Sequence, residues 1–377
     1  MTEPIGRRIA FHRRRRGLSQ AAVAGLVGRS ESWLSQVERG LRTVDSYSVL
    51  RDLARVLRVD IGTLTGSGSE PERSVCHSDL VAIERALLSS FANAPIADVG
   101  SAVPALHGAY QAAHYDEVLA ALPGLVEALD GQEPQLVAAG YTVVAKTLTK
   151  IGQHDLALVA ADRARTAAQR GGELADVGMA VYQVACALLP TARAPLAEEL
   201  AVTTATELDG DSPAMWSVTG ALWLIAAVAA ARRIDAAAAE ERLDRAHQLA
   251  DRLGEDANHR WTAFGPTNVA IHRVSVAVEL GDAPAALAAA EAVDLDRLPE
   301  GLRSRRVQVQ LDIAWAQAQR RRDAEALVAL LEIERAAPQV TRRNAVARDT
   351  IRQLLARARG TSGAAVRGLA HRAGVAV

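Results

Sequence analysis

Residues 19–39 read SQAAVAGLVGRSESWLSQVER, and this stretch predicts two short helices joined by a tight turn. Val23 and Val27 mark the inner face of the first helix, and Leu34 continues that face in the second. Gly28 lies between them, and glycine accepts a positive φ in a turn without steric cost. The pattern therefore favours a compact pair of crossing helices.

Polar residues lie at the start of both predicted helices and along one face of the second. Ser19 and Ser30 each precede a helical run, where a hydroxyl can accept hydrogen bonds from the first amide groups. The polar face of the second helix, at spacings of three, four and seven, consists of Ser32, Ser35, Gln36 and Arg39. Short polar side chains in this arrangement suit a helix that lies against base edges and phosphates.

The first sixty-five residues or so resemble the Xre/Cro family of helix-turn-helix DNA-binding domains. The shared residues are Arg13, Arg16-Gly17-Leu18-Ser19-Gln20, Ala24, Gly28, Ser30, Leu34-Ser35 and Val37-Glu38-Arg39-Gly40. The resemblance implies that Arg13 and Glu38 pair to clamp the first helix on the recognition helix, and that Gln20 lies at the DNA backbone or a base. The chain departs from the family in having Ala21 and Ala22 where acidic residues are common, so a capping box is missing there.

Charge distinguishes this helix pair from the similar pairs that are common in all-helical proteins. Residues 1–60 contain twelve arginines against six acidic residues, whereas the whole chain has a net charge of -1. A basic N-terminal segment on an acidic body is typical of a nucleic-acid-binding module. We expect DNA to be contacted by Arg16, Gln20, Arg29, Ser30, Glu31, Ser32, Ser35, Gln36, Arg39 and Arg42.

The N-terminal domain is predicted to contain five helices within residues 1–66. A first helix carries Ile5, Ile9 and the basic run before Gly17, a fourth spans residues 45–57, and a last turn spans residues 61–64. The stretch GSGSEPERS, residues 66–74, is rich in glycine and serine and predicts a flexible linker. The expected domains are therefore residues 1–66, a linker at 67–77, and a second domain at 78–377.

A recurring corner, in which a helix ends and an aspartate begins an alanine-rich helix, organises the second domain. It recurs at Asp116, Asp155, Asp235, Asp282 and Asp323, which are 39, 80, 47 and 41 residues apart. If the gap of 80 covers two units, the period is close to forty, which predicts stacked helical hairpins. The segments after Asp155 and Asp282 resemble the tetratricopeptide repeat. The predicted fold is all-α: a helix-turn-helix domain followed by a tetratricopeptide-like helical solenoid, whose first helices line a concave side.

Composition excludes several other classes of protein. Two lysines, Lys146 and Lys150, stand against forty-one arginines, a bias we attribute to a GC-rich genome. No stretch reaches the roughly twenty apolar residues that span a bilayer, and no signal peptide is evident, so we expect a cytoplasmic protein without a membrane partner. Cys76 and Cys186 are read as unpaired thiols. His154, His247, His259 and His272 lack partners at catalytic or metal-ligand spacing, so no enzyme activity, metal or cofactor is expected.

The segment NHRWTAFGPTN, residues 258–268, interrupts the repeats and leaves two interpretations open. Its aromatic residues and the polar stripe of the following helix either fill a gap between repeats or form a ligand site. If they form a site, an anionic or amide-bearing ligand would suit it. The residues expected to line such a site are Tyr182, Trp223, Trp261, Phe264, Asn268, His272, Arg306 and Gln310.

An Xre-type domain on a tetratricopeptide-like body resembles the peptide-sensing regulators of Gram-positive bacteria and a group of actinobacterial regulators. The resemblance implies a homodimeric transcription regulator that binds a double-stranded DNA operator and senses a peptide or small-molecule effector. Alternatively, the solenoid binds a protein partner and no small ligand. A third class, a helical scaffold or enzyme with an incidental helix-turn-helix, is also left open.

Overall fold

The computed structural model describes residues 5–16, 18–40, 42, 44, 47–57, 59, 64, 77–88, 96–191, 193–358 and 360–375. Across these ranges the regular structure is helical and includes no strand. The chain forms two compact units, one centred on Met1–Ser74 and one that contains Val75–Ala231 and Asp235–Val377. The all-α prediction is confirmed.

The first unit contains the predicted helix pair. Its described helices are α1 (Ile5–Arg15), α2 (Gln20–Leu26), α3 (Glu31–Glu38) and α4 (Tyr47–Leu57). Gly28 has a φ of +67° between α2 and α3, and the backbone N–H of Arg29 closes the turn on the carbonyl of Ala24 at 2.8 Å. Ser19 and Ser30 cap α2 and α3 as predicted, accepting from the amides of the residues three positions on.

The core of the first unit explains how α3 is held. Ile9, Val23, Leu34 and Leu53 are fully buried and come from four different helices. The close approach of α1 to α3 depends on Gly6, because a Cβ atom there would collide with the carbonyl group of Val37. The predicted closing turn, apart from Leu64, and the linker, apart from His77, lie outside the described residues.

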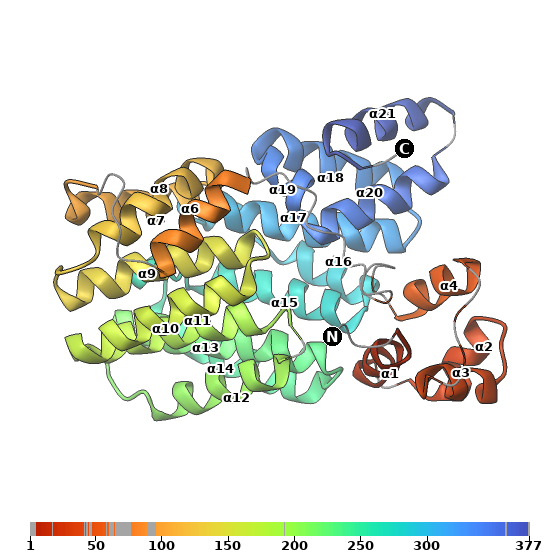
Figure 1. The fold of residues 1–377 in the computed structure, drawn as a ribbon, viewed down its shortest axis with the longest axis horizontal. Coiled ribbons are helices and arrows are strands. Elements are labelled where there is room, and N and C mark those ends of the chain that lie inside the picture. Colours follow the sequence, from red (N-terminus) through yellow and green to blue (C-terminus); the bar gives the residue numbers. More distant parts are fainter. Residues whose placement is uncertain are drawn as a thin grey trace. The chain divides into compact units, whose positions relative to one another are not determined.

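The second unit is a series of antiparallel helical hairpins (Figure 1). Its helices are α6 (His77–Leu88), α7 (Val99–Gln111), α8 (Tyr115–Ala128), α9 (Pro134–Lys150), α10 (His154–Gly171), α11 (Leu174–Leu188), α12 (Ala194–Glu207), α13 (Pro213–Arg232), α14 (Ala236–Leu253), α15 (Pro266–Leu280), α16 (Ala283–Glu291), α17 (Arg303–Gln319), α18 (Asp323–Ala336), α19 (Pro338–Arg343), α20 (Ala345–Arg357) and α21 (Gly360–Arg372). Two short 3-10 helices, η1 (His259–Trp261) and η2 (Leu295–Arg297), lie in the connections.

The aspartate corners of the sequence are the hairpin turns of this unit. Each has one residue with positive φ, after which a backbone N–H donates to the carbonyl five residues earlier; the positive-φ residues are Ala113, Gly152, Ile234, Gly281 and Arg321. This is the usual way to end a helix and satisfy its last carbonyls. Asp235 and Asp282 also cap the next helix through their side chains. The hairpin α11–α12 turns without such an aspartate, which accounts for the gap of 80 residues.

The prediction that no stretch reaches the roughly twenty apolar residues needed to span a bilayer is wrong. Helix α13, Pro213–Arg232, is twenty residues long and apolar enough by length and composition to cross a membrane. However, 89% of its apolar stretch is buried inside the protein. A helix that is apolar on all sides is typical of the centre of a large helical core, and the alanines that dominate α13 let its neighbours pack closely around it.

A hairpin near the start of the second unit, α7–α8, packs against one near its end, α17–α18. Tyr115 shares a core cluster with Val307 and Leu311 of α17, and Arg343 pairs with Asp116 at 2.8 Å. Helix α7 therefore lies beside α17, although about two hundred residues separate them. Helices α7 and α17 consequently border the same cavity.

Candidate DNA-binding surface and ligand cavity

A buried ion pair fixes α3 against α1. The Nε of Arg13 donates to Oε1 of Glu38 at 2.5 Å and its Nη2 to Oε2 at 2.9 Å, with both residues buried. The hydrogen bond to Glu38 raises the pKa of Arg13 further. Gln20 of α2 donates to the same carboxylate at 2.7 Å. Three helices therefore meet at Glu38, and the implied Arg13–Glu38 clamp is present.

The polar side chains predicted to contact DNA gather on and around α3. Those with exposed side chains are Arg29, Ser30, Glu31, Ser32, Arg39 and Arg42, whereas Arg16, Gln20, Ser35 and Gln36 are half-buried. Three of these residues also have structural roles, since Ser30 caps α3, Arg16 donates to the carbonyl of Val56 and Gln20 donates to Glu38. Their contacts with DNA remain a prediction.

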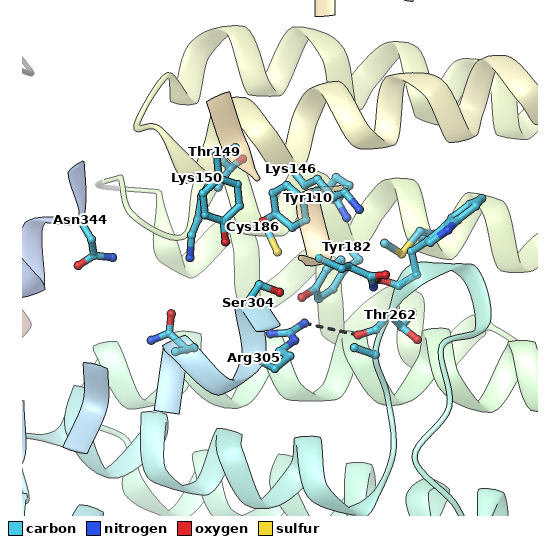
Figure 2. Close-up of a pocket in the computed structure, with 17 residues that line it drawn as sticks. Tyr110, Lys146, Thr149, Lys150, Tyr182, Cys186, Thr262, Ser304, Arg305 and Asn344 are labelled. Carbon is cyan, nitrogen blue, oxygen red and sulfur yellow. Dashed lines mark hydrogen bonds between the residues drawn. The ribbon is translucent and has the colours of Figure 1, made fainter. Parts of the chain in front are cut away.

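A cavity of about 270 Å³ lies inside the second unit (Figure 2). It is bounded by α7, α8, α9, α11 and α17, by the loop after Asn258, and by the start of α20. Its lining residues are Tyr110, Gln111, Tyr115, Lys146, Thr149, Lys150, Met179, Tyr182, Gln183, Cys186, Trp261, Thr262, Ala263, Ser304, Arg305, Gln308 and Asn344. Aromatic rings and neutral polar groups thus make up most of the surface.

Three basic side chains, those of Lys146, Lys150 and Arg305, line this cavity, and none of the described residues that line it is an aspartate or a glutamate. The Nζ of Lys146 lies 2.6 Å from Nδ1 of His107 and 4.4 Å from the centre of the Tyr110 ring. Arg305 donates to the carbonyl of Thr262 at 3.4 Å, the contact drawn in Figure 2. Lys150 lies 5.6 Å from the ring of Tyr115. These three contacts are all with neutral groups, while the charge of Arg305 acts on Lys146 and that of Lys150 acts on the buried carboxyl group of Asp312.

Burial and the field of Arg305 set the protonation of the groups around the cavity. Burial and then Arg305 lower the pKa of Lys146 well below its usual value. Burial and Lys146 likewise lower the pKa of His107. A neutral His107 that donates from Nε2 to the carbonyl of Ala139, at 3.0 Å, leaves Nδ1 free to accept from Lys146. Burial also raises the pKa of Cys186 to about 11, so this sulfur is a thiol at neutral pH and an unsuitable nucleophile.

The loop of residues 258–265 forms one side of the cavity in an unusual backbone conformation. Arg260, Trp261 and Ala263 all have positive φ, between 51° and 58°. Such values are uncommon for bulky residues and persist where the surroundings enforce them. Here the amides of Gln111 and Asn258 exchange two hydrogen bonds of 2.9 Å, and the ring of Trp261 stacks on that of His107 at 3.8 Å.

Of the eight residues predicted to line a ligand site, Tyr182 and Trp261 line this cavity. Phe264 is fully buried and packs where a Cβ on Gly220 would lie, and Trp223 is buried in the core around α13 with Arg245 over its ring. Both fill space in the core; for Phe264 this agrees with the interpretation of residues 258–268 as a segment that fills a gap between repeats.

The predicted polar residues also lie outside the lining. Asn268 and His272 are buried, and Nδ1 of His272 bonds the carbonyl of Asn268. Burial and then Arg305 lower the pKa of His272 to about 3, so it is neutral. Arg306 donates to the carbonyl of Leu298, and Gln310 to Glu332 at 3.4 Å. On α17 the cavity-lining residues are Ser304, Arg305 and Gln308.

Sequence reasoning missed Lys146, Lys150 and Arg305 as site residues. One signal was present, because these lysines are the only two in the chain, and the structure brings both to the same cavity. A composition bias explains why lysine is rare. It does not explain why the two that remain lie one turn apart on the cavity face of α9. Among the described residues, no group of three His, Cys, Asp or Glu is placed to hold a metal ion.

Comparison with known proteins identifies the first unit. A family described as a helix-turn-helix domain matches residues 4–65. Two proteins named HTH-type transcriptional regulator SinR, from Bacillus licheniformis and Bacillus subtilis (strain 168), are each 37% identical over 68 residues, which is 18% of this chain and 61% of theirs. The chain thus matches about three fifths of the length of these relatives. Residues 4–65 form a helix-turn-helix domain.

A solved structure covers more of the chain at lower similarity. It is that of Bacillus thuringiensis PlcR in complex with the peptide PapR7 and DNA. This chain is 14% identical to it, with 77% of this chain and 92% of that chain covered and a TM-score of 0.38.

Proposed function

We propose that this protein is a homodimeric, DNA-binding transcription regulator whose helical-repeat unit binds an effector in its cavity and alters the affinity for an operator. The observation that carries the proposal is the exposed polar surface of α3, on a basic helix-turn-helix domain whose recognition helix is fixed by the Arg13–Glu38 pair. The similarity to the SinR proteins, which are transcriptional regulators, supports the same role.

Dimerisation follows from the reach of one helix-turn-helix domain. A single recognition helix reads only a few base pairs, and helix-turn-helix dimers read two half-sites about one helical turn apart. We therefore propose a homodimer on a double-stranded operator in the cytoplasm.

The effector role of the second unit is supported by its cavity. A soluble helical repeat that served only as a spacer would gain nothing from three cations gathered without acidic partners. A regulator whose repeat unit binds only a protein partner is the second candidate, and it predicts DNA affinity that no small molecule changes.

The test is operator selection with the full chain from a random DNA library, followed by affinity measurements on the selected sequence by fluorescence anisotropy. The proposal predicts a selected sequence with two half-sites, a dimeric complex by sedimentation, and affinity that falls steeply with salt. Gln36→Ala should lose discrimination, whereas the control Glu241→Ala, on an exposed face of α14, should not. A monomeric complex with no sequence preference would contradict the proposal.

A further inference from the structure

We propose that the cavity is a binding site for a small organic anion, whose carboxylate or phosphate group is held by Lys150 and Arg305 with Lys146, and whose apolar body lies among the aromatic rings. This deepens the effector role proposed above and rests on it only for the link to DNA. The site itself is argued from the geometry of the second unit.

The first step is the contrast between these cations and the other basic residues of the same unit. Many arginine side chains elsewhere in it meet carboxylates, as in Arg242–Glu198 at 2.7 Å, Arg260–Asp176 at 2.7 Å and Arg357–Asp323 at 2.9 Å. The unit is acidic and contains many other carboxylates, yet none is among the described residues that line the cavity. Cations that are kept apart from available acids suit an anion that arrives from outside.

Hydroxyl groups in the cavity supply a second, independent observation. The hydroxyl of Tyr115 is buried, with the residue 3% exposed, and it has no hydrogen-bond partner within the protein. The Oγ1 of Thr149, one residue from Lys150, is buried and unpartnered as well. Buried polar groups are rarely left unpaired, and each can donate to an anionic oxygen. Tyr115 and Thr149, which carry these unpaired donors, line the same cavity as the three basic residues.

Size and surroundings restrict the body of the ligand. A volume of about 270 Å³ is just below the usual range of ligand sites, about 300 to 1,000 Å³. Tyr110, Tyr182 and Trp261 offer flat apolar surfaces around this space. A compact acid or phosphate ester with one planar or short apolar group fits these limits, whereas an extended peptide needs a longer groove.

Arg305 is suited to hold the charged group. It is the cavity residue whose field reaches Lys146, His272 and the tyrosines, and Figure 2 shows it extending from α17 toward Tyr182. A guanidinium can donate two parallel hydrogen bonds to a carboxylate or a phosphate. Lys150, on α9, would add a second positive charge from another element.

The experiment measures ligand binding to the full chain by thermal stabilisation and by titration calorimetry. The probes are benzoate and phenyl phosphate, which distinguish a carboxylate from a phosphate, with benzamide as the neutral analogue and equal added sodium chloride as the salt control. We expect at least one anion to stabilise the second unit and to bind at least tenfold more tightly than benzamide. Arg305→Gln and Lys150→Met, on different helices, should each weaken that binding by about tenfold or more.

The matched control is Arg306→Gln, since Arg306 is the next residue on α17 and donates to Leu298 outside the cavity lining. It should leave anion binding unchanged. Equal stabilisation by benzamide, no stabilisation by either anion beyond that of sodium chloride, or equal losses in Arg305→Gln and Arg306→Gln would each overturn the anion site.

The same variants separate this inference from the proposed function. If anions bind but operator affinity is unchanged, the site stands and the effector role fails. If neither anion binds, but operator affinity responds to a neutral molecule and that response survives Arg305→Gln and Lys150→Met, the effector role stands and the anion site fails.

Discussion

The helix-turn-helix unit and the cavity of the repeat unit both contain buried basic side chains, but the surroundings of these side chains differ. In the first, the buried Arg13 is paired with Glu38, and other arginines are exposed toward solvent. In the second, Lys146 is buried against His107 and Tyr110, and Arg305 and Lys150 line a cavity that has no carboxylate among its described lining residues. Paired buried charge holds a structure in place, whereas unpaired buried charge is costly and points to a ligand. Substitutions can test this difference directly.

The largest effect is expected from Glu38→Ala. Removing one partner of a buried ion pair leaves an uncompensated charge and costs about 3–5 kcal/mol. We expect faster hydrogen exchange in α1 to α3 of the full chain, measured by mass spectrometry. Glu31→Ala, an exposed acid on the same helix, is the control and should change little.

A double substitution sharpens the first prediction. The double variant Arg13→Met, Glu38→Leu removes both charges. It should regain much of the protection from hydrogen exchange in α1 to α3, because replacing a whole buried ion pair by apolar groups often changes stability little. If Glu38→Ala alone leaves exchange in α1 to α3 unchanged, the pair is not what holds α3.

Asp312, which lies behind the cavity, gives the next effect in size. It accepts hydrogen bonds from Ser275 at 2.6 Å and Gln308 at 3.1 Å, and burial raises its pKa from 3.8 to about 7, with Glu279 adding to the rise and Lys150 opposing it. Between these pH values the folded state keeps a proton that the unfolded state has lost, so stability falls as pH rises from about 4 to 7.

Asp312→Asn should remove this loss of stability with rising pH. Relative to the natural chain, the variant should be more stable by on the order of 3 kcal/mol at pH 8, with the gain fading toward pH 4. Urea unfolding of the second unit across this pH range measures the difference. A gain that is independent of pH would show that ionisation of Asp312 is not its cause.

The contrast between the units also explains what the sequence could predict. The helix-turn-helix motif is contiguous, so its caps, its glycine turn and its polar face can all be read within residues 19–39. The hairpins could be counted because their corners repeat one local device, a positive-φ residue before an aspartate. Local patterns of this kind depend on backbone geometry that nearby residues determine.

The cavity has no comparable local pattern. Its lining runs from Tyr110 to Asn344 and forms only because α7 meets α17. On α17 the start at Arg303 has no side-chain cap to mark it, so the rotation of the helix could not be fixed, and Arg306 was expected where Arg305 lies. The positive φ of Trp261 is imposed by the surrounding contacts and has no sequence signal.

Substitutions of the residues expected to contact bases should have an intermediate effect, on DNA discrimination. If Gln36 and Ser32 contact bases, Gln36→Ala and Ser32→Ala should each reduce discrimination between operator and random DNA by about 1–3 kcal/mol. Competition binding with both DNAs measures this. A loss that is equal for operator and random DNA would move these residues from base recognition to backbone contact.

Lys146→Met is expected to change stability by less than about 1 kcal/mol, in contrast to Glu38→Ala. The ammonium group has no acidic partner to leave behind, and methionine keeps much of the length and volume of the side chain. Urea unfolding of the second unit provides the measurement. A loss as large as that of Glu38→Ala would mean that Lys146 holds the fold and would break the contrast between the two units.

Arg39→Ala is expected to have the smallest effect, and it tests whether the exposed arginines act through phosphates. Arg39 is exposed at the end of α3, and its Nε donates only to the backbone carbonyl of Ser35. A lost phosphate contact should weaken binding to operator and random DNA alike and lower the slope of log affinity against log salt by about one. Arg252→Ala, which removes an equal charge from a pair with Asp211 in the second unit, should leave the slope unchanged. If both variants reduce the slope equally, net charge rather than a contact at α3 governs binding. If Arg39→Ala alone reduces discrimination between operator and random DNA, Arg39 contacts bases rather than phosphates.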